Sequence, residues 1–251
     1  MAQHGHSAAC CSIPPIVSKG YEGKGRYETI GGMKTYVTGP SNASKALLFI
    51  YDIFGYFPQS IQGADILATA DKDHSYQVFM PDFLEGKPAD ISWYPPDTDA
   101  KGKALGEFFR TTGAPPAAAK KVPGFVKEAQ KKYEGLQTWG VVGFCWGGKI
   151  VSMTSGKDTL FKAAAECHPA MVDPSEATSI TIPLCMLASG DEPAEDVEKF
   201  KQNLAGEKYV EIFGDQIHGW MAARSDLENE KVMKEYERGY KTLLDFFRKH
   251  L

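Results

Sequence analysis

One stretch of ten residues decides how the chain is interpreted: Val141-Val142-Gly143-Phe144-Cys145-Trp146-Gly147-Gly148-Lys149-Ile150. Two β-branched residues lead into the first glycine, and an apolar run follows the last one. This pattern is typical of a buried strand, a tight turn and a helix. The Gly-x-Cys-x-Gly spacing is that of a nucleophile elbow, a strained turn that presents a catalytic side chain, with a thiol in place of the usual hydroxyl.

The glycines of such a turn have a steric role. The nucleophile is held at unfavourable backbone angles, and a side chain at either flanking glycine would collide with the neighbouring strand or helix. The turn also places Cys145 at a helix N-terminus, where backbone N–H groups favour a thiolate. The stretch therefore predicts a reactive cysteine.

Two other interpretations fit the same residues. A cysteine in an apolar turn is often only part of the packing. The stretch also matches most of a phosphate-binding P-loop, Gly-x4-Gly-Lys. Ile150 stands where that loop needs Ser or Thr for Mg²⁺, however, and Phe144 and Trp146 are bulky for a loop that wraps phosphates. The rest of the chain has to decide among the three.

The composition favours one globular domain. The 251 residues are 43% hydrophobic and 24% charged, which suits a single α/β domain with a substantial core. A net charge of -4 argues against nucleic acid as a partner, and no apolar run is long enough to span a membrane. Residues 1–12 lack the features of a signal peptide, so we expect a cytoplasmic protein.

The cysteines do not indicate a disulfide framework, because they are odd in number and irregularly spaced: Cys10, Cys11, Cys145, Cys167 and Cys185. The pair at 10 and 11 lies near two histidines, His4 and His6. That spacing matches no standard zinc pattern, and an ordinary exposed segment is the simpler interpretation. We expect no metal site and no cofactor.

Strands and helices alternate along the chain. Residues 26–37 indicate a β-hairpin around Gly31-Gly32, and the apolar run 46–51 is typical of a strand buried on both faces of a parallel sheet. Further strands are expected at 76–80, 138–142, 163–167, 182–188 and 209–213, with helices at 60–74, 122–132, 147–154, 194–204 and 229–250. The alternation predicts an α/β fold with a mostly parallel sheet flanked by helices. Residues 1–25 are expected to be irregular, and residues 26–251 to form one domain.

The least regular part is residues 83–123, which are rich in Pro, Gly, Lys and Asp. A long insertion between a strand and the next helix is usually a functional loop. We expect a lid-like segment here, with a short helix at residues 100–110.

An activated cysteine needs a base, and the base needs an orienting acid. Asp191 follows the strand expected at 182–188, and His218 follows the strand expected at 209–213. Both would lie at the carboxyl edge of the sheet, where Cys145 projects. The order nucleophile, acid, histidine is that of the α/β-hydrolase fold. His168 also follows a strand but precedes the acid, so we expect it to be structural.

The same edge of the sheet would supply an oxyanion hole. In this fold one donor comes from the loop after an early strand, here Ile53, and the other from the residue after the nucleophile, here Trp146. Two such backbone N–H groups stabilise a developing oxyanion by several kcal/mol, given ~2.7–4 kcal/mol for one lost donor. Asp52 ends the strand just before this loop, so its carboxylate faces either solvent or the site.

At these residues the sequence resembles the dienelactone hydrolase family, especially its fungal members. The resemblance extends from about residue 26 to the end, and Gly-Phe-Cys-Trp-Gly-Gly is its most specific motif. The matching segments, in chain order, are Ile53-Phe54-Gly55, Pro81-Asp82-Phe83, Gly143 to Gly148, the turn at Asp191, and His218-Gly219-Trp220.

The resemblance implies an α/β-hydrolase fold without a large cap domain. It also implies a carboxylic ester or lactone hydrolase of the carboxymethylenebutenolidase type, with a Cys145–His218–Asp191 triad and an acyl-thioester intermediate. The family opens an enol-lactone, dienelactone, to maleylacetate. A family glutamate, paired with an arginine, takes the thiol proton when substrate arrives; Asp52 and Arg224 would stand in their places.

Both members of this activating pair depart from the family. Asp52 is one methylene shorter than the glutamate, and Arg224 lies two residues further past the histidine than in the bacterial enzymes. The family's second arginine, which binds substrate, has no clear equivalent; Lys87, Lys101, Lys103 and Arg110 are all possible. The aromatic residues Phe54, Trp146 and Trp220, with Trp93 and Tyr94, suggest an apolar or aromatic small-molecule ester or lactone, although all could equally be core residues.

Two other functions remain open from sequence alone. One is a hydrolase of a different ester or thioester metabolite; the other is a non-catalytic binding protein that keeps the fold. A His218 too far from Cys145 to hydrogen-bond would favour the binding protein. The chain could act as a monomer or a homodimer.

Overall fold

A mixed sheet of eight strands runs through the computed structural model, which describes residues 16–71 and 73–251. The strands are β1 (Arg26–Ile30), β2 (Met33–Thr38), β3 (Lys45–Ile50), β4 (Gln77–Pro81), β5 (Thr138–Phe144), β6 (Ala163–Cys167), β7 (Leu184–Ser189) and β8 (Lys208–Phe213). Their order across the sheet is β1-β2-β4-β3-β5-β6-β7-β8. The pairs β1–β2 and β2–β4 are antiparallel, and all the others are parallel.

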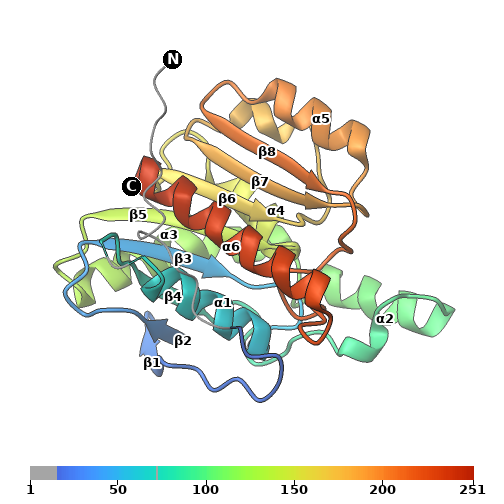
Figure 1. The fold of residues 1–251 in the computed structure, drawn as a ribbon, viewed down its shortest axis with the longest axis horizontal. Helices are drawn as coiled ribbons and strands as arrows, with labels where there is room; N and C mark the ends of the chain where they lie inside the picture. Colours follow the sequence, from blue (N-terminus) through green and yellow to red (C-terminus); the bar gives the residue numbers. More distant parts are fainter. Residues whose placement is uncertain (1–15, 72) are drawn as a thin grey trace.

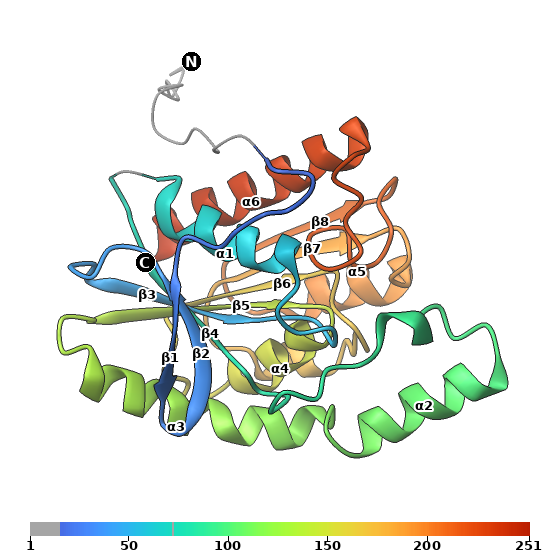
Figure 2. The same cartoon turned by 90° about the horizontal axis from the view of Figure 1, so that it is seen from below.

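Helices cover both faces of this sheet. They are α1 (Pro58–Thr69), α2 (Asp99–Arg110), α3 (Pro115–Lys132), α4 (Trp146–Thr154), α5 (Ala194–Asn203) and α6 (Glu230–His250), with short 3₁₀ turns η1 (Ile91–Trp93) and η2 (Glu176–Ser179). Figure 1 shows α6 crossing one face beside α1, and Figure 2 shows α3 and α4 on the opposite face. The prediction of a mostly parallel sheet flanked by helices is confirmed.

The central strands carry the core. Every residue of β4, β6 and β7 is buried, as a sheet covered on both faces requires. Phe49 of β3 stacks on Phe144 of β5 with ring centroids 4.4 Å apart, directly beneath the turn that follows β5. The carboxyl ends of five parallel strands, β3 and β5 to β8, therefore meet at one well-supported edge.

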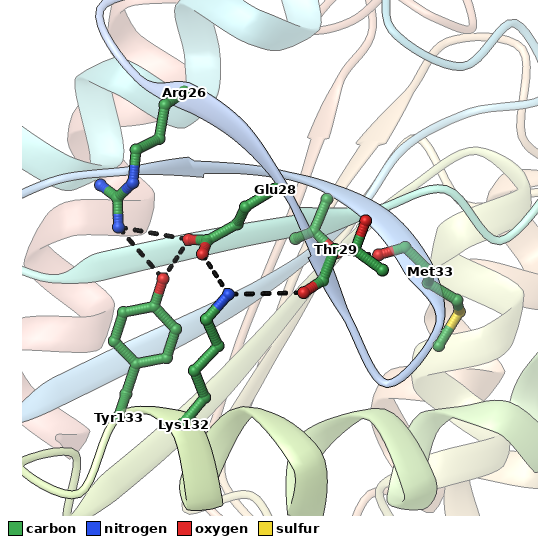
Figure 3. Close-up of polar contacts among 7 residues, drawn as sticks. Arg26, Glu28, Thr29, Met33, Lys132 and Tyr133 are labelled. Atoms are coloured by element: carbon green, nitrogen blue, oxygen red, sulfur yellow. Dashed lines mark hydrogen bonds and ion pairs between the residues drawn. The ribbon is translucent and has the colours of Figure 1, made fainter.

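The hairpin predicted for residues 26–37 is confirmed, with Gly31 and Gly32 at positive φ in its turn. Its edge strand is joined to the end of α3 by polar contacts drawn in Figure 3. The Glu28 carboxylate accepts from Lys132 Nζ and Tyr133 Oη, and Arg26 Nη2 lies 3.2 Å from it. These contacts hold β1 against the body of the protein at the edge farthest from β8.

The segment 83–123 is more helical than its composition predicts. The short helix expected at 100–110 is α2, but α3 begins at residue 115 rather than 122. Pro115 and Pro116 occupy the first helical positions, where a missing N–H costs nothing and the fixed φ already suits a helix. In Figure 2 α2 stands away from the sheet on an arm of the chain. It buries only two of its residues, Leu105 and Phe108.

The Cys10-Cys11 pair, together with His4 and His6, lies outside the residues that the structure describes. No helix within residues 16–71 and 73–251 combines the length and apolar character needed to cross a bilayer.

Candidate active site

The predicted elbow is a turn between β5 and α4. Cys145 has φ +53° and ψ -113°, a conformation that non-glycine residues rarely adopt. Hydrogen bonds hold it there: its N–H donates to the Cys167 carbonyl at 3.0 Å, and its carbonyl accepts from Ala170 N–H at 2.9 Å. Strain of this kind persists only where the surroundings over-determine it. The turn therefore fixes the thiol at the carboxyl edge of the sheet.

The flanking glycines are required by close backbone contacts. A Cβ on Gly143 would lie 2.1 Å from the carbonyl oxygen of Gly147, and a Cβ on Gly147 would lie 2.1 Å from that of Ile50. Neither backbone can yield, because β3 and α4 are both packed into the core. The steric reason predicted from the sequence is the one found.

Gly147→Ala is therefore expected to lower the free energy of unfolding by roughly 2–3 kcal/mol, as overpacking against rigid backbone does. The matched control is Gly102→Ala in α2, where a Cβ meets nothing within 4 Å. Helix propensity should make that control neutral or stabilising by about 0.5–1 kcal/mol. Urea unfolding curves measure both; equal midpoints for the two variants would contradict the steric account.

His218 lies beside the thiol, on the loop after β8. Both His218 and Cys145 line the same cavity, and Nδ1 of His218 lies 2.6 Å from Oε1 of Glu192. The imidazole thus lies next to a thiol and against a carboxylate, an arrangement that resembles a nucleophile–base–acid triad.

The acid beside the imidazole is Glu192, one residue beyond the expected Asp191. The exposed carboxylate of Asp191 accepts from the backbone N–H of His218 at 2.8 Å and does not reach the ring nitrogen. Glu192 is buried, and Ser189 holds it: Ser189 Oγ donates to Oε1 at 3.0 Å, and Ser189 N–H donates to Oε2. The carboxylate that meets the imidazole is therefore that of Glu192 and not that of Asp191, which contacts the backbone of the histidine loop instead.

The charges around His218 favour its protonated form. Burial by itself would lower the pKa of His218, but its interactions with the Cys145 side chain and with the Glu192 carboxylate outweigh burial and raise that pKa to about 11.

The two expected oxyanion donors lie on either side of the thiol. Trp146 is the first residue of α4, where the helix itself provides no acceptor for the N–H. Ile53 N–H makes no backbone hydrogen bond within the described residues, while Ile53 carbonyl accepts from Ala89 N–H at 2.8 Å, which fixes the loop. The indole of Trp146 is buried and donates to the Gly113 carbonyl at 2.8 Å, so this side chain is a packing group.

Asp52 is occupied by backbone donors. Its two carboxylate oxygens accept from Phe54 N–H at 2.9 Å and from Ala223 N–H at 3.1 Å. Burial raises the pKa of Asp52 to about 6, although these hydrogen bonds and the charges of His218 and Arg224 oppose the shift. Asp52 thus ties the Ile53 loop to the segment after His218.

Arg224 is similarly engaged. Its Nη1 donates to the His218 carbonyl, and its guanidinium carbon lies 4.5 Å from the ring centroid of Tyr94. Gly219, at φ +94°, makes room for the stem of Arg224, since a Cβ there would lie 3.0 Å from that of the arginine.

A cavity of about 630 Å³ opens above the thiol. Its walls are Ile53, Tyr94, Leu105, Phe109, Cys145, Pro169, Ala170, Met171, Val172, Asp191, Glu192, Pro193 and His218. The α2 arm and the loop after β6 supply most of the apolar wall. Sequence reasoning placed the 83–123 segment near the site but did not single out Leu105, Phe109 or residues 169–172, because nothing in their local pattern separates them from ordinary packing.

Several expected site residues do not line this cavity. Phe54 and Trp220 are buried and pack against other rings, Phe57 and Phe213 respectively. Both rings thus have packing partners, and their part in substrate binding stays a prediction. Lys149, the P-loop candidate, lies 2.7 Å from Glu176 and donates to the Met171 carbonyl, so its ammonium already has partners.

His168 is fully buried, and its ring centroid lies 5.2 Å from that of His218. Burial and the nearby charge of His218 hold the pKa of His168 well below its usual range, so the ring is neutral. This agrees with its expected structural role. No group of three or more His, Cys, Asp or Glu in the described part of the chain could hold a metal ion.

Comparison with known proteins agrees with this geometry. The family model described as "Dienelactone hydrolase family" matches residues 33–251. This chain belongs to the dienelactone hydrolase family. It is 36% identical over 249 residues to an uncharacterized AIM2 family protein of Schizosaccharomyces pombe, covering 96% of this chain and 98% of that one. It is 25% identical to a human carboxymethylenebutenolidase homolog, covering 92% and 93%.

Solved structures of the family share the fold. A dienelactone hydrolase from Anabaena variabilis superposes with a TM-score of 0.65 at 14% identity, covering 92% of this chain and 98% of that one. Family membership and the carboxymethylenebutenolidase homologs support a hydrolase that acts on esters or lactones.

Proposed function

We propose that this dienelactone hydrolase family member hydrolyses small carboxylic esters or lactones through Cys145, His218 and Glu192. The observation that carries the proposal is the His218 imidazole, which lines the same cavity as Cys145 and lies 2.6 Å from the buried carboxylate of Glu192. That arrangement on a strained elbow supports catalysis over a binding protein, which needs neither the strain nor the buried acid.

The proposed chemistry has two half-reactions. The Cys145 thiolate attacks the ester carbonyl, and the N–H groups of Ile53 and Trp146 stabilise the oxyanion. His218 gives its proton to the leaving alcohol as the acyl-thioester forms. Water then attacks the thioester with His218 as general base, and the carboxylic acid product leaves. Glu192 orients the ring and stabilises its charge throughout.

Asp52 and Arg224 have supporting roles in this proposal. The family resemblance would make Asp52 the acceptor of the thiol proton, but its oxygens already accept from two backbone N–H groups. His218 lines the cavity together with Cys145, whereas Asp52 does not, so we assign the acceptance of that proton to the imidazole. We therefore propose that Asp52 and Arg224 position the Ile53 and His218 loops.

Trapping the intermediate tests the proposal. With p-nitrophenyl acetate, the wild type is expected to release a burst of nitrophenol and to gain one acetyl group on the peptide that contains Cys145, removable by hydroxylamine. Peptide mass spectrometry distinguishes this thiol from Cys10 and Cys11. Cys145→Ala should show neither burst nor adduct. Full hydrolysis by Cys145→Ala, or an adduct on another residue, would sink the mechanism.

A further inference from the structure

The cavity beside Cys145 has mainly apolar walls that come from separate parts of the chain. Leu105 and Phe109 project from α2, Ile53 from the loop after β3, and residues 169–172 from the loop after β6. Met171 is held at φ +56° and leaves 48% of its surface exposed. The acyl group of a thioester on Cys145 has to occupy this space, because the sulfur itself lines it.

The charged groups of the cavity are not suited to an anion. Two carboxylates line it, Asp191 and Glu192, and both are bound to His218. The charge of a protonated His218 is already paired with the Glu192 carboxylate, 2.6 Å from its Nδ1. No lysine or arginine lines the cavity among the described residues. A carboxylate in the acyl group would therefore lie among apolar walls and like charges, without a cation to pair with.

Three of the nearby cations already have partners. On the α2 arm, Lys101 Nζ lies 2.8 Å from an oxygen of Asp97, and Arg110 Nη2 lies 2.7 Å from one of Glu107. Arg224 donates to the His218 carbonyl and stacks on Tyr94.

Taken with the proposed hydrolase function, on which this inference rests, the geometry points to an acyl group that is uncharged and apolar. We propose that the site selects esters with aliphatic or aromatic acyl chains over esters with a carboxylate in the acyl chain. Phe109 and Leu105 of α2 set this preference. The α2 arm is thus the specificity element of the site, while the sheet edge carries the chemistry.

A matched pair of esters tests the preference. p-Nitrophenyl pentanoate and mono-p-nitrophenyl glutarate differ only in a terminal methyl or carboxylate. The wild type should cleave the pentanoate with a kcat/KM about 100-fold higher than the glutarate, because the carboxylate is desolvated without a partner. A ratio below about 10 would overturn the inference.

The variant that assigns the preference to α2 is Phe109→Lys, which adds one positive charge to the cavity wall. It should reduce the pentanoate-to-glutarate ratio by at least about 10-fold, since an opposite charge now faces the carboxylate. Ala100→Lys is the control: it adds the same charge to an exposed position of the same helix, outside the cavity. An equal drop of this ratio in both variants would mean that the cavity wall does not discriminate between the two esters.

A second readout needs no hydrolysis. N-Butyl iodoacetamide and its carboxypropyl analogue alkylate the Cys145 thiol and carry the same matched pair of chain ends. Phe109→Lys should raise the rate for the carboxylate relative to the neutral reagent by about 10-fold, and Ala100→Lys should leave the relative rate unchanged. If neither ester is cleaved, the hydrolase proposal fails, and these alkylation rates decide the present inference by themselves.

Discussion

Glu192→Gln is expected to lower kcat/KM for aryl esters by about 10³–10⁴-fold, the size of effect seen when a triad acid is replaced by its amide. The cause is twofold. Nδ1 of His218 lies 2.6 Å from Glu192 Oε1, so an amide at this position can turn the imidazole into the wrong tautomer. It also removes the negative charge that stabilises the imidazolium. Steady-state kinetics with p-nitrophenyl acetate measures the loss.

Asp191→Asn is the matched comparison, with the same change of charge one residue away. Its carboxylate accepts from the His218 backbone N–H, a contact that an amide oxygen can also make. We expect a loss of less than about 10-fold, mostly from a looser loop. A larger loss in Asp191→Asn than in Glu192→Gln would return the role of acid to Asp191.

Glu166→Gln is expected to stabilise the protein at alkaline pH and to leave its stability at pH 4 unchanged. Glu166 lies on β6 between β5 and β7, is 1% exposed, and accepts a hydrogen bond from Ser152 Oγ at 2.6 Å. Burial raises the pKa of its carboxyl to about 8. Nearby Glu176 also raises this pKa, whereas the hydrogen bond from Ser152 and the charge of Lys149 lower it. The proposed mechanism does not use this group.

The sign of this effect follows from where the proton is held. Between pH 4.5 and about 8 the folded state keeps a proton that the unfolded chain has released, so stability falls as the pH rises through this window. The full loss, reached above pH 8, is on the order of 3–5 kcal/mol. Glutamine has no proton to lose and can still accept from Ser152, so the variant avoids the loss.

Urea unfolding at about pH 5, 7 and 9 checks the prediction, because these values bracket the window in which stability is expected to fall. The difference between Glu166→Gln and wild type should grow with each step. Glu134→Gln, at an exposed position, provides the control for removing a charge and should follow the wild type. Parallel curves for wild type and Glu166→Gln would show that this carboxyl does not govern the pH dependence.

Much of the fold could be predicted from the sequence because buried parallel strands and an elbow have strict local requirements. Runs such as residues 46–51 have few alternatives once both faces are apolar. Cys145 could be recognised because both flanking positions have to be glycine: a Cβ at either one would lie 2.1 Å from a backbone oxygen. The start of α3 was missed since Pro115-Pro116 is equally compatible with a loop and with a helix N-terminus.

The candidate site was less predictable where the decision depends on side-chain direction. Asp191 and Glu192 are adjacent acids after the same strand, and only the turn made by Ser189 determines which one faces the imidazole. Phe54 and Trp220 are aromatic like a pocket wall, but aromatic residues serve core and pocket alike. Leu105 and Phe109 line the cavity because of where the α2 arm packs relative to the thiol. That placement depends on long-range contacts, which no local sequence pattern encodes.

The weak attachment of α2 has an evolutionary consequence. Substitutions that alter substrate choice often fall in a tightly packed pocket wall. Each of them lowers the free energy of unfolding and so reduces the number of further substitutions that the protein tolerates. Here the wall stands on a helix that buries only Leu105 and Phe108. We therefore expect relatives of this chain to diverge in what they cleave through changes to this one arm, while the sheet and its elbow stay unchanged.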